Sequence, residues 1–299
     1  MVERLLTSLG QIHLGGRSPA DFLIILVDND PDGRTRSIYE KASAAVPIRV
    51  LFVEEPRRGR PFARNRAVAE AMARKIGLVA FIDDDDLPAP DWLHHLLEIQ
   101  VKTQADIVYG IGKAVVNLDW PDWLRNSVFF KTSPAEGLTK YSTPRGVSTF
   151  NVLIGRSVFE RLNNDGFVFL PEFERLEDTD FFIRAASNHF KFARSEDSVI
   201  HKNYESHRLS ATGLLREALL NGIFAMRLLK KHGSPVQVRH RKKKALKKIT
   251  LAFLKFPICI FSATSLMNNL FILTREMGML YICHEKFPQK VTKECQPSR

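Results

Sequence analysis

Leu78-Val-Ala-Phe-Ile-Asp-Asp-Asp-Asp86 joins five apolar residues to four consecutive aspartates, and this stretch decides the fold class. A short apolar run that ends in polar residues is typical of a buried strand in a parallel sheet. Four adjacent carboxylates repel one another, so they need either full contact with solvent or a bound cation. At the end of a buried strand we favour a hard divalent cation, Mg²⁺ or Mn²⁺, and a solvated acidic loop is the alternative.

An apolar strand followed by acidic residues also occurs earlier, where Phe22–Val27 runs into Asp28-Asn29-Asp30. Predicted strands and helices then alternate, which is the pattern of an α/β domain. Ligands of open α/β sheets bind at the carboxyl ends of strands, so Asp28 and Asp83–Asp86 are expected to line one crevice. The expected elements are strands at 22–27, 48–53, 78–82, 150–154 and 190–200 and helices at 63–75, 92–103 and 176–186, and the pattern becomes irregular after residue 109.

The basic charge of the chain is confined to its last third. Of the 44 Lys and Arg and the 33 Asp and Glu, residues 201–299 hold 19 and 5, which leaves 25 and 28 in residues 1–200. This asymmetry predicts a near-neutral globular domain over 1–210 and a basic helical tail over 211–299. A basic tail is suited to a polyanion such as anionic lipid or nucleic acid.

Apolar helices in the tail favour a membrane surface over nucleic acid. Leu214–Lys231 has apolar residues at three- and four-residue spacing between basic ones, which predicts an amphipathic helix. Ile249–Leu273 is apolar, but Lys255 and Pro257 keep it short of the roughly 18 uninterrupted residues of a spanning helix, so an interfacial helix is expected. Basic residues beside such helices suit an anionic membrane surface. No nucleic acid partner is expected, because the domain carries no recognised binding motif.

The cysteines and the amino terminus predict a cytoplasmic chain. Cys259, Cys283 and Cys295 are odd in number and have no metal-ligand spacing, so reduced thiols are expected. The first residues lack the basic start and the apolar core of a signal peptide.

Four motifs, taken together, resemble glycosyltransferase family 2. In the order and spacing of that family they are Val27-Asp-Asn-Asp30, Gly59-Arg-Pro-Phe-Ala-Arg-Asn-Arg66, Phe81-Ile-Asp-Asp-Asp-Asp86 and Glu177-Asp-Thr-Asp-Phe181. The resemblance covers residues 3–210, and Gly146-Val-Ser-Thr-Phe-Asn-Val-Leu-Ile154 is similar to bacterial exopolysaccharide enzymes of the succinoglycan type. It implies a GT-A fold, an α/β arrangement in which helices flank a Rossmann-like mixed sheet.

The resemblance also implies a nucleotide-sugar donor and assigns residues to it. Asp28 would contact the base or ribose, and Arg64 and Asn65 would shape the nucleotide pocket, with an ordinary surface charge as the alternative for Arg64. Asp83 would lie near the ribose and on the metal, and Asp85 would bind the metal. Asp84, as a further donor-binding acid, and Asp86 would support them, and a register shifted by one within the four aspartates is the alternative.

Catalysis is implied by the pair Glu177-Asp178. Asp178 would remove the proton from the acceptor hydroxyl, and attack opposite a metal-held diphosphate would invert the anomeric configuration. Helix-capping acids are the alternative for this pair. His201 matches a position where some related enzymes have a histidine on the metal or the phosphates, although a structural histidine is favoured. Trp120 and Trp123 are candidates for an acceptor platform or for core residues.

The chain departs from the family at its start. Family members begin with a strand and a turn ahead of the helix that Val2–Leu9 resembles, so the domain over 1–210 is expected to lack that strand. In the family the turn after that strand holds the nucleotide base, so the departure bears on donor binding.

We therefore predict a metal-dependent, inverting glycosyltransferase with a basic, amphipathic helical extension. Its acceptor would be a glycan, expected to be lipid-linked, in polysaccharide or glycolipid assembly. Its place would be the cytoplasmic face of a bacterial inner membrane or the cytoplasm. A non-catalytic GT-A-like protein that binds sugars or partners is the alternative. A sugar nucleotidyltransferase is less favoured, because a Gly-rich basic triphosphate loop is not visible near the start.

Overall fold

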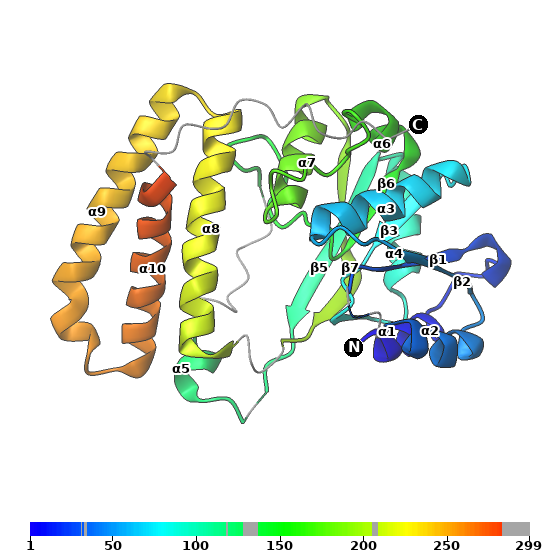
Figure 1. Ribbon diagram of the computed structural model, residues 1–299, viewed down its shortest axis with the longest axis horizontal. Coiled ribbons are helices and arrows are strands. Elements are labelled where there is room, and N and C mark those ends of the chain that lie inside the picture. Colours follow the sequence, from blue (N-terminus) through cyan, green and yellow to red (C-terminus); the bar gives the residue numbers. More distant parts are fainter. Residues whose placement is uncertain (31, 33–34, 118, 128–136, 205–208, 283–299) are drawn as a thin grey trace. The chain divides into compact units, whose positions relative to one another are not determined.

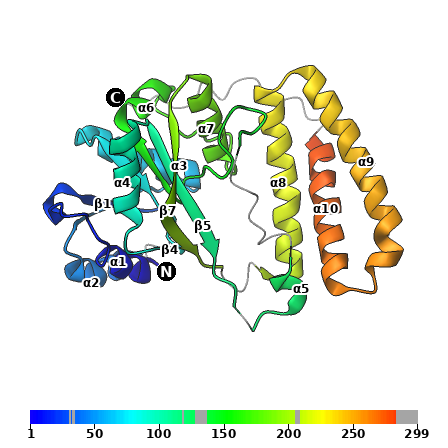
Figure 2. The same cartoon turned by 180° about the vertical axis from the view of Figure 1, so that it is seen from behind.

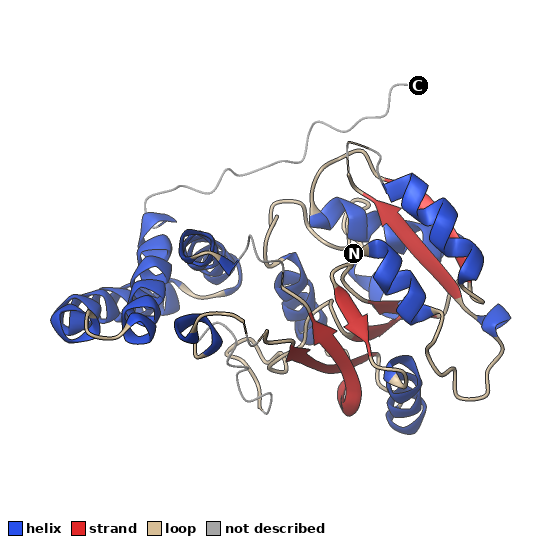
Figure 3. Cartoon of the chain, turned by 90° about the horizontal axis from the view of Figure 1, so that it is seen from below, coloured by secondary structure: helices blue, strands red, loops and turns tan. Residues whose placement is uncertain are grey.

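The protein is described from a computed structural model, which covers residues 1–282 except 31, 33–34, 118, 128–136 and 205–208. The chain separates into two compact units, Met1–Ser210 and Ala211–Arg299. Within the described residues the first unit combines helices with strands, and the second consists of helices (Figure 3). Cys283 and Cys295 lie outside the described residues, and Cys259 is a half-buried free thiol.

The first unit has the α/β composition expected from the sequence. Its strands are β1 (Leu23–Asp28), β2 (Arg49–Glu54), β3 (Leu78–Phe81), β4 (Asp86–Pro88), β5 (Ile107–Ala114), β6 (Val152–Gly155) and β7 (Phe192–Lys202). Its α-helices are α1 (Val2–Leu9), α2 (Thr35–Ala42), α3 (Arg60–Ala73), α4 (Trp92–Thr103), α5 (Asp122–Arg125), α6 (Arg156–Leu162) and α7 (Glu177–Ser187). The helix predicted over 92–103 is α4 at the same residues, whereas α3 begins three residues before the predicted 63, with Pro61 in its first turn.

The strands form two sheets. β1 and β2 pair in parallel, and the other sheet has the order β3-β6-β5-β7-β4. In the larger sheet β5 and β7 are parallel, while β6 is antiparallel to both β3 and β5, and β4 is antiparallel to β7. The mixed sheet implied by the family resemblance is therefore observed. Three of its strands, β3, β7 and β4, bring the acidic stretch and the end of β7 together.

Alternation along the central strands builds a core on each face of the larger sheet. Ile107 and Tyr109 of β5 belong to one cluster with α3, α6 and α7, and Val108 between them belongs to another with α1 and α4. This is the two-residue period of a strand that is covered on both sides. α3, α6 and α7 thus cover one face and α4 the other (Figures 1 and 2).

The second unit contains three successive helices, α8 (Ala211–His232), α9 (Pro235–Cys259) and α10 (Ala263–Tyr281). α10 packs against both α8 and α9. α8 and α10 approach closely at two glycines: an added Cβ would lie 2.0 Å from the Arg275 carbonyl oxygen at Gly222 and 2.2 Å from the Leu219 carbonyl oxygen at Gly278. Of the apolar stripe predicted over 214–231, Met226 and Leu229 are buried, whereas Leu215, Leu219 and Ile223 are half-buried.

The apolar segment predicted as one interfacial helix over 249–273 is divided. α9 begins earlier, where the Ser234 hydroxyl accepts from the amide of Gln237 in a capping box, and ends soon after Pro257. α10 starts after Ser262, whose hydroxyl accepts from the Ser265 amide. Among the described residues, none of the helices is both long and apolar enough to cross a membrane.

Candidate active site

The acidic stretch after β3 places three of its four carboxylates together. Oxygen atoms of Asp83, Asp85 and Asp86 lie within 4.8 Å of one another. Asp83 and Asp85 are half-buried, Asp86 is buried, and Asp84 is exposed. A tight turn, in which the Asp86 amide donates to the Asp83 carbonyl at 3.2 Å, produces this arrangement.

Asp86 differs from its neighbours because it belongs to β4 and has a basic partner. Its Oδ2 accepts from the Nζ of Lys202 at 3.2 Å, and this ammonium also lies 3.8 Å from the centroid of the Phe150 ring. Burial raises the pKa of Asp86 to about 6; Lys202 opposes that rise, and Asp83 and Asp85 add to it. The other oxygen of Asp86, Oδ1, is buried without a hydrogen-bond partner among the described residues.

These acids suit a hard divalent cation. Mg²⁺ and Mn²⁺ prefer carboxylate oxygens, and the cluster supplies three carboxylates, one of which has an unsatisfied buried oxygen. A cation there would also relieve the mutual repulsion of the aspartates. His201, by contrast, lies exposed on β7 opposite Leu87, and the alternation of the strand directs Lys202 rather than His201 to Asp86. The role of His201 at the metal stays a prediction.

Arg64 of α3 joins this acidic loop to the start of α7. Its Nη2 donates to Asp83 Oδ1 at 3.2 Å, and its Nη1 donates to Glu177 Oε1. The Arg64 side chain is only 13% exposed, and that of Glu177 only 2%. Burial opposes the charge of Arg64, but the acids outweigh it and raise the pKa of the guanidinium. Burial likewise raises the pKa of Glu177, and Arg64 offsets this only in part.

An aromatic cluster supports the Arg64 bridge from below. Phe169 lies 5.9 Å beneath the guanidinium, and its ring centroid is 5.8 Å from Phe81 and 4.8 Å from Phe181. Phe81 closes β3 just before the aspartates, and Phe181 lies in the first half of α7. The same apolar contacts therefore fix the positions of the acidic loop and the α7 start.

Asp178 lies beside the Arg64 bridge, at the amino-terminal end of α7. Its Oδ2 accepts from the Ser148 hydroxyl at 2.6 Å, and its Oδ1 accepts from the Thr179 amide at 2.7 Å. The helix follows Leu176, whose φ of 63° is rare for a residue other than glycine. Asp178 is only half-buried, so it can be reached from solvent, whereas Glu177 points into the protein.

Two further predicted residues contribute to the scaffold. Asn65 is buried and hydrogen-bonds to the backbone: its Oδ1 accepts from the amides of Val168 and Phe169, and its Nδ2 donates to the Phe169 carbonyl at 2.6 Å. It therefore holds the segment that carries Phe169. Asp28 is buried at the end of β1, where its Oδ1 accepts from the Asp30 amide at 3.0 Å.

A pocket of about 340 Å³ opens beside the acids. Asp84 and Asp85 form part of its wall, and Trp120 and Tyr204 give it aromatic surfaces. Burial raises the pKa of Tyr204, with a further contribution from Asp86 and Asp85, so the phenol remains a hydrogen-bond donor at neutral pH. The complete lining is Met1, Arg4, Asp84, Asp85, Leu87, Val115, Asn117, Trp120, Asn203 and Tyr204.

Sequence reasoning missed several of these residues. Arg4, Asn203 and Tyr204 were not predicted, although Asn203 and Tyr204 directly follow β7 and the strand-end rule could have found them. Trp120 lines the pocket, as the prediction of an acceptor platform requires, whereas Trp123 lies half-buried in α5 and is not part of this lining.

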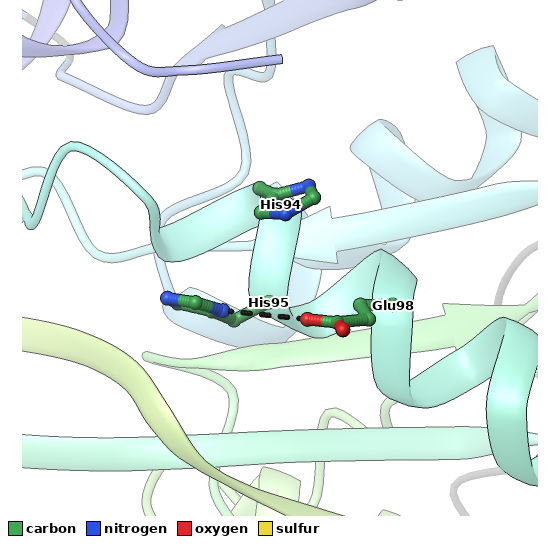
Figure 4. A group of neighbouring side chains, drawn as sticks. All are labelled: His94, His95 and Glu98. Atoms are coloured by element: carbon green, nitrogen blue, oxygen red, sulfur yellow. Dashed lines mark ion pairs between the residues drawn. The ribbon is translucent and has the colours of Figure 1, made fainter. Parts of the chain in front are cut away.

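A second group of possible metal ligands, His94, His95 and Glu98, lies on α4. His95 Nδ1 and Glu98 Oε2 form an ion pair at 3.7 Å, and Figure 4 shows the His94 ring separate from that pair. Nδ1 of His94 instead faces Gly15, where an added Cβ would lie 2.3 Å away. We interpret this group as an ordinary helix-surface pair next to a packed histidine.

Comparison with protein families gives a match over just more than half of the chain. The model described as Glycosyl transferase family 2 matches residues 1–162 of the 299. The succinoglycan biosynthesis protein ExoM of Rhizobium meliloti (strain 1021) is 29% identical over 230 residues, which is 76% of this chain and 72% of that protein.

Comparison with solved structures agrees on the fold. The mannosyltransferase PcManGT from Pyrobaculum calidifontis, in complex with GDP-Man and Mn²⁺, superposes with a TM-score of 0.56 at 14% identity, over 94% of this chain and 83% of that one. S. aureus TarS 1-349 in complex with UDP gives a TM-score of 0.52 at 17% identity, over 92% and 86%. The chain spans about half, 52%, of a longer TarS structure. At these identities the matches establish the fold alone.

Proposed function

The chain belongs to glycosyl transferase family 2, and from this premise we propose that it transfers a sugar from a nucleotide-sugar donor to a glycan acceptor with inversion at the anomeric carbon. The relative ExoM takes part in succinoglycan biosynthesis, which favours a role in polysaccharide assembly. Solved structures of the same fold hold UDP, UDP-GlcNAc or GDP-Man with Mn²⁺, which favours a donor of that class.

The observation that carries this proposal is the Arg64 bridge. It joins the acids that suit a metal to the helix that presents Asp178. In this proposal one connected set of side chains would serve both the departure of the diphosphate and the activation of the acceptor.

Asp83 and Asp85 would hold the cation, which supplies positive charge to the departing diphosphate. Asp178 would accept the proton of the acceptor hydroxyl while that oxygen forms the new bond to the anomeric carbon and the bond to the phosphate oxygen breaks. Ser148 and the Thr179 amide orient the carboxylate for this step. Glu177 acts through Arg64 and is a positioning residue, not a second base, because its side chain is buried in the ion pair. Asp28 and Asp84 are the proposed contacts to the donor.

The acceptor is proposed to be lipid-linked. Residues 211–299 are basic in sequence, and the described part of this segment consists of the helices α8, α9 and α10. We propose that this segment meets an anionic membrane surface on the cytoplasmic side of a bacterial inner membrane.

Transfer from a set of nucleotide sugars tests the proposal. Asp178→Asn should lower kcat by about a thousandfold while donor binding persists, because a base typically contributes 10²–10⁴. Asp85→Ala should remove metal-dependent donor binding itself. Glu98→Gln on α4 is the matched acidic control and should be active. Full activity in Asp178→Asn would refute the assignment of the base. Donor binding that is equally tight with and without a divalent cation would refute the cation site.

A further inference from the structure

α9 contacts the rest of its unit through a narrow stripe. Its buried residues are Ala245 and Ala252, and Arg241 and Lys248 on the same face both reach Glu276 of α10, at 2.6 and 3.3 Å. These four positions are three or four residues apart, which is one face of a helix. Asn269 of α10 completes the contact by donating to the Ala252 carbonyl at 2.9 Å. α9 also has a smaller contact with α8.

The apolar side chains at the carboxyl-terminal end of α9 are left on the surface. We call residues 251–261 the α9–α10 tip, because they form the last turns of α9 and the connection to α10 (Figure 1). Phe261 is 86% exposed, Ile258 75% and Leu254 69%. The other exposed apolar members are Leu251, Phe253, Phe256 and Ile260. So many large apolar side chains within eleven residues form a patch of the kind that marks an interaction site.

The charge around this tip has one sign. Between Glu217 and Glu276 the chain has twelve Lys and Arg and no Asp or Glu. Glu276 is buried and already neutralised by Arg241 and Lys248. The remaining basic residues of α9 include the exposed Arg239, Lys243, Lys244, Lys247 and Lys255. The occupant of the patch must therefore combine an apolar interior with negative charge at its surface.

We infer that the α9–α10 tip inserts into the interfacial layer of an anionic lipid bilayer, with the basic face of α9 at the headgroups. Such a layer supplies both properties, and Lys255 can reach the headgroups while its stem lies among the acyl chains. This assigns membrane contact to the tip and not to α8, whose apolar residues Leu214, Phe224 and Leu228 are buried. A partner protein would need an acidic and apolar face that matches the shape of the tip. An anionic bilayer needs no matching shape, because its headgroups supply the negative charge and its acyl chains accept the apolar side chains.

The inference deepens the proposed membrane location and is tested without any step of catalysis. The full chain is sedimented with vesicles of phosphatidylcholine alone and with vesicles that contain phosphatidylglycerol. We expect binding to the anionic vesicles that weakens with salt. Phe253→Gln, Ile258→Gln and Phe261→Gln together should lower the partition coefficient more than about tenfold, because each removes an inserted apolar side chain.

Matched control variants distinguish insertion of the tip from nonspecific binding to vesicles. Val236→Gln changes a residue that is 72% exposed on the same helix, about 33 Å from Ile258 along α9, and should bind like the wild type. Lys243→Gln, Lys244→Gln and Lys247→Gln together should reduce binding to anionic vesicles only. In Phe261→Trp, tryptophan emission should shift to the blue on vesicles and be quenched by brominated lipid.

Three results would overturn the inference. The tip variant could bind as well as the wild type, or Phe261→Trp could show no shift on vesicles that sediment the protein. A wild-type dimer that fails to bind vesicles and becomes a monomer in the tip variant would instead assign the patch to a second copy of the chain. Vesicle binding with no transferase activity would overturn the proposed function and leave this inference standing.

Discussion

Replacing Arg64 by methionine should destabilise the first unit more than any surface change. The substitution keeps much of the side-chain volume above Phe169 but removes the charge between Asp83 and Glu177. Glu177 is 1% exposed, and its second oxygen, Oε2, already has no partner among the described residues. Leaving a buried carboxylate uncompensated costs about 3–5 kcal/mol. For a chain of this size that corresponds to a fall in Tm on the order of 10 °C.

The pH dependence of this loss is part of the prediction. Burial raises the pKa of Glu177, and the loss of Arg64 removes the charge that lowers it, so the folded variant binds a proton that the unfolded chain releases. Stability from such a group is fully present below the unfolded pKa and is lost as pH rises through the folded pKa. The deficit of Arg64→Met should therefore be smaller at pH 5 than at pH 8. Adding Glu177→Gln should recover most of it.

Tryptophan fluorescence is the appropriate probe, because Trp92, Trp120 and Trp123 are the three tryptophans of the chain and all belong to the first unit. Urea unfolding followed at 25 °C, at both pH values, gives the free energy of that unit without a contribution from the helical unit. Two results would refute the reasoning: a single variant within about 1 kcal/mol of the wild type, or a double variant no more stable than Arg64→Met.

Three further outcomes are expected. Asn65→Ala should cost about 2–4 kcal/mol by fluorescence-detected unfolding, since it leaves the buried amides of Val168 and Phe169 without an acceptor; a loss below 1 kcal/mol would contradict the role of this clamp. Gly278→Ala should lower the Tm of the helical unit, measured by circular dichroism, and leave the tryptophan transition unchanged, because the new Cβ meets the Leu219 carbonyl at 2.2 Å. In metal-free protein the pKa of Asp86, raised to about 6, should make stability fall as pH rises from 4 to 6; Asp86→Asn should flatten that slope in urea titrations, and an unchanged slope would assign it to another group.

Local pattern predicted most strands and the longer helices of the first unit, but it missed α2, β4 and α6 and did not give the strand pairing. The apolar run before Asp83 and the helix pattern over 92–103 are strong local signals, and both elements are observed. The run was interpreted as a strand of a parallel sheet, however, and β3 is antiparallel to β6. The order β3-β6-β5-β7-β4 depends on contacts between strands far apart in sequence, which no local period records. For the same reason Lys202 was not predicted as the partner of Asp86, although both are within one strand pairing.

For the site residues, too, local motifs were informative and long-range contacts were not predicted. Motifs identified Asp83, Asp85 and Asp178, but the environment of each side chain was decided by neighbours from elsewhere in the chain. Asn65 was predicted to shape a nucleotide pocket, but its side chain hydrogen-bonds to the backbone of residues 168–169. In the second unit the sequence predicts an amphipathic helix over 214–231, and only its packing on α10 shows that much of α8, including Met226 and Leu229, is buried.

The single positive charge of Arg64 neutralises two carboxylates, Asp83 and Glu177, only in part. In the proposed mechanism, a cation that takes up the charge of Asp83 would leave more of the Arg64 charge to Glu177 at the start of α7. Metal binding at Asp83 would thereby change the electrostatic environment of the helix that carries Asp178. By reciprocity, a ligand that orders the start of α7 would change the affinity for the cation by the same factor.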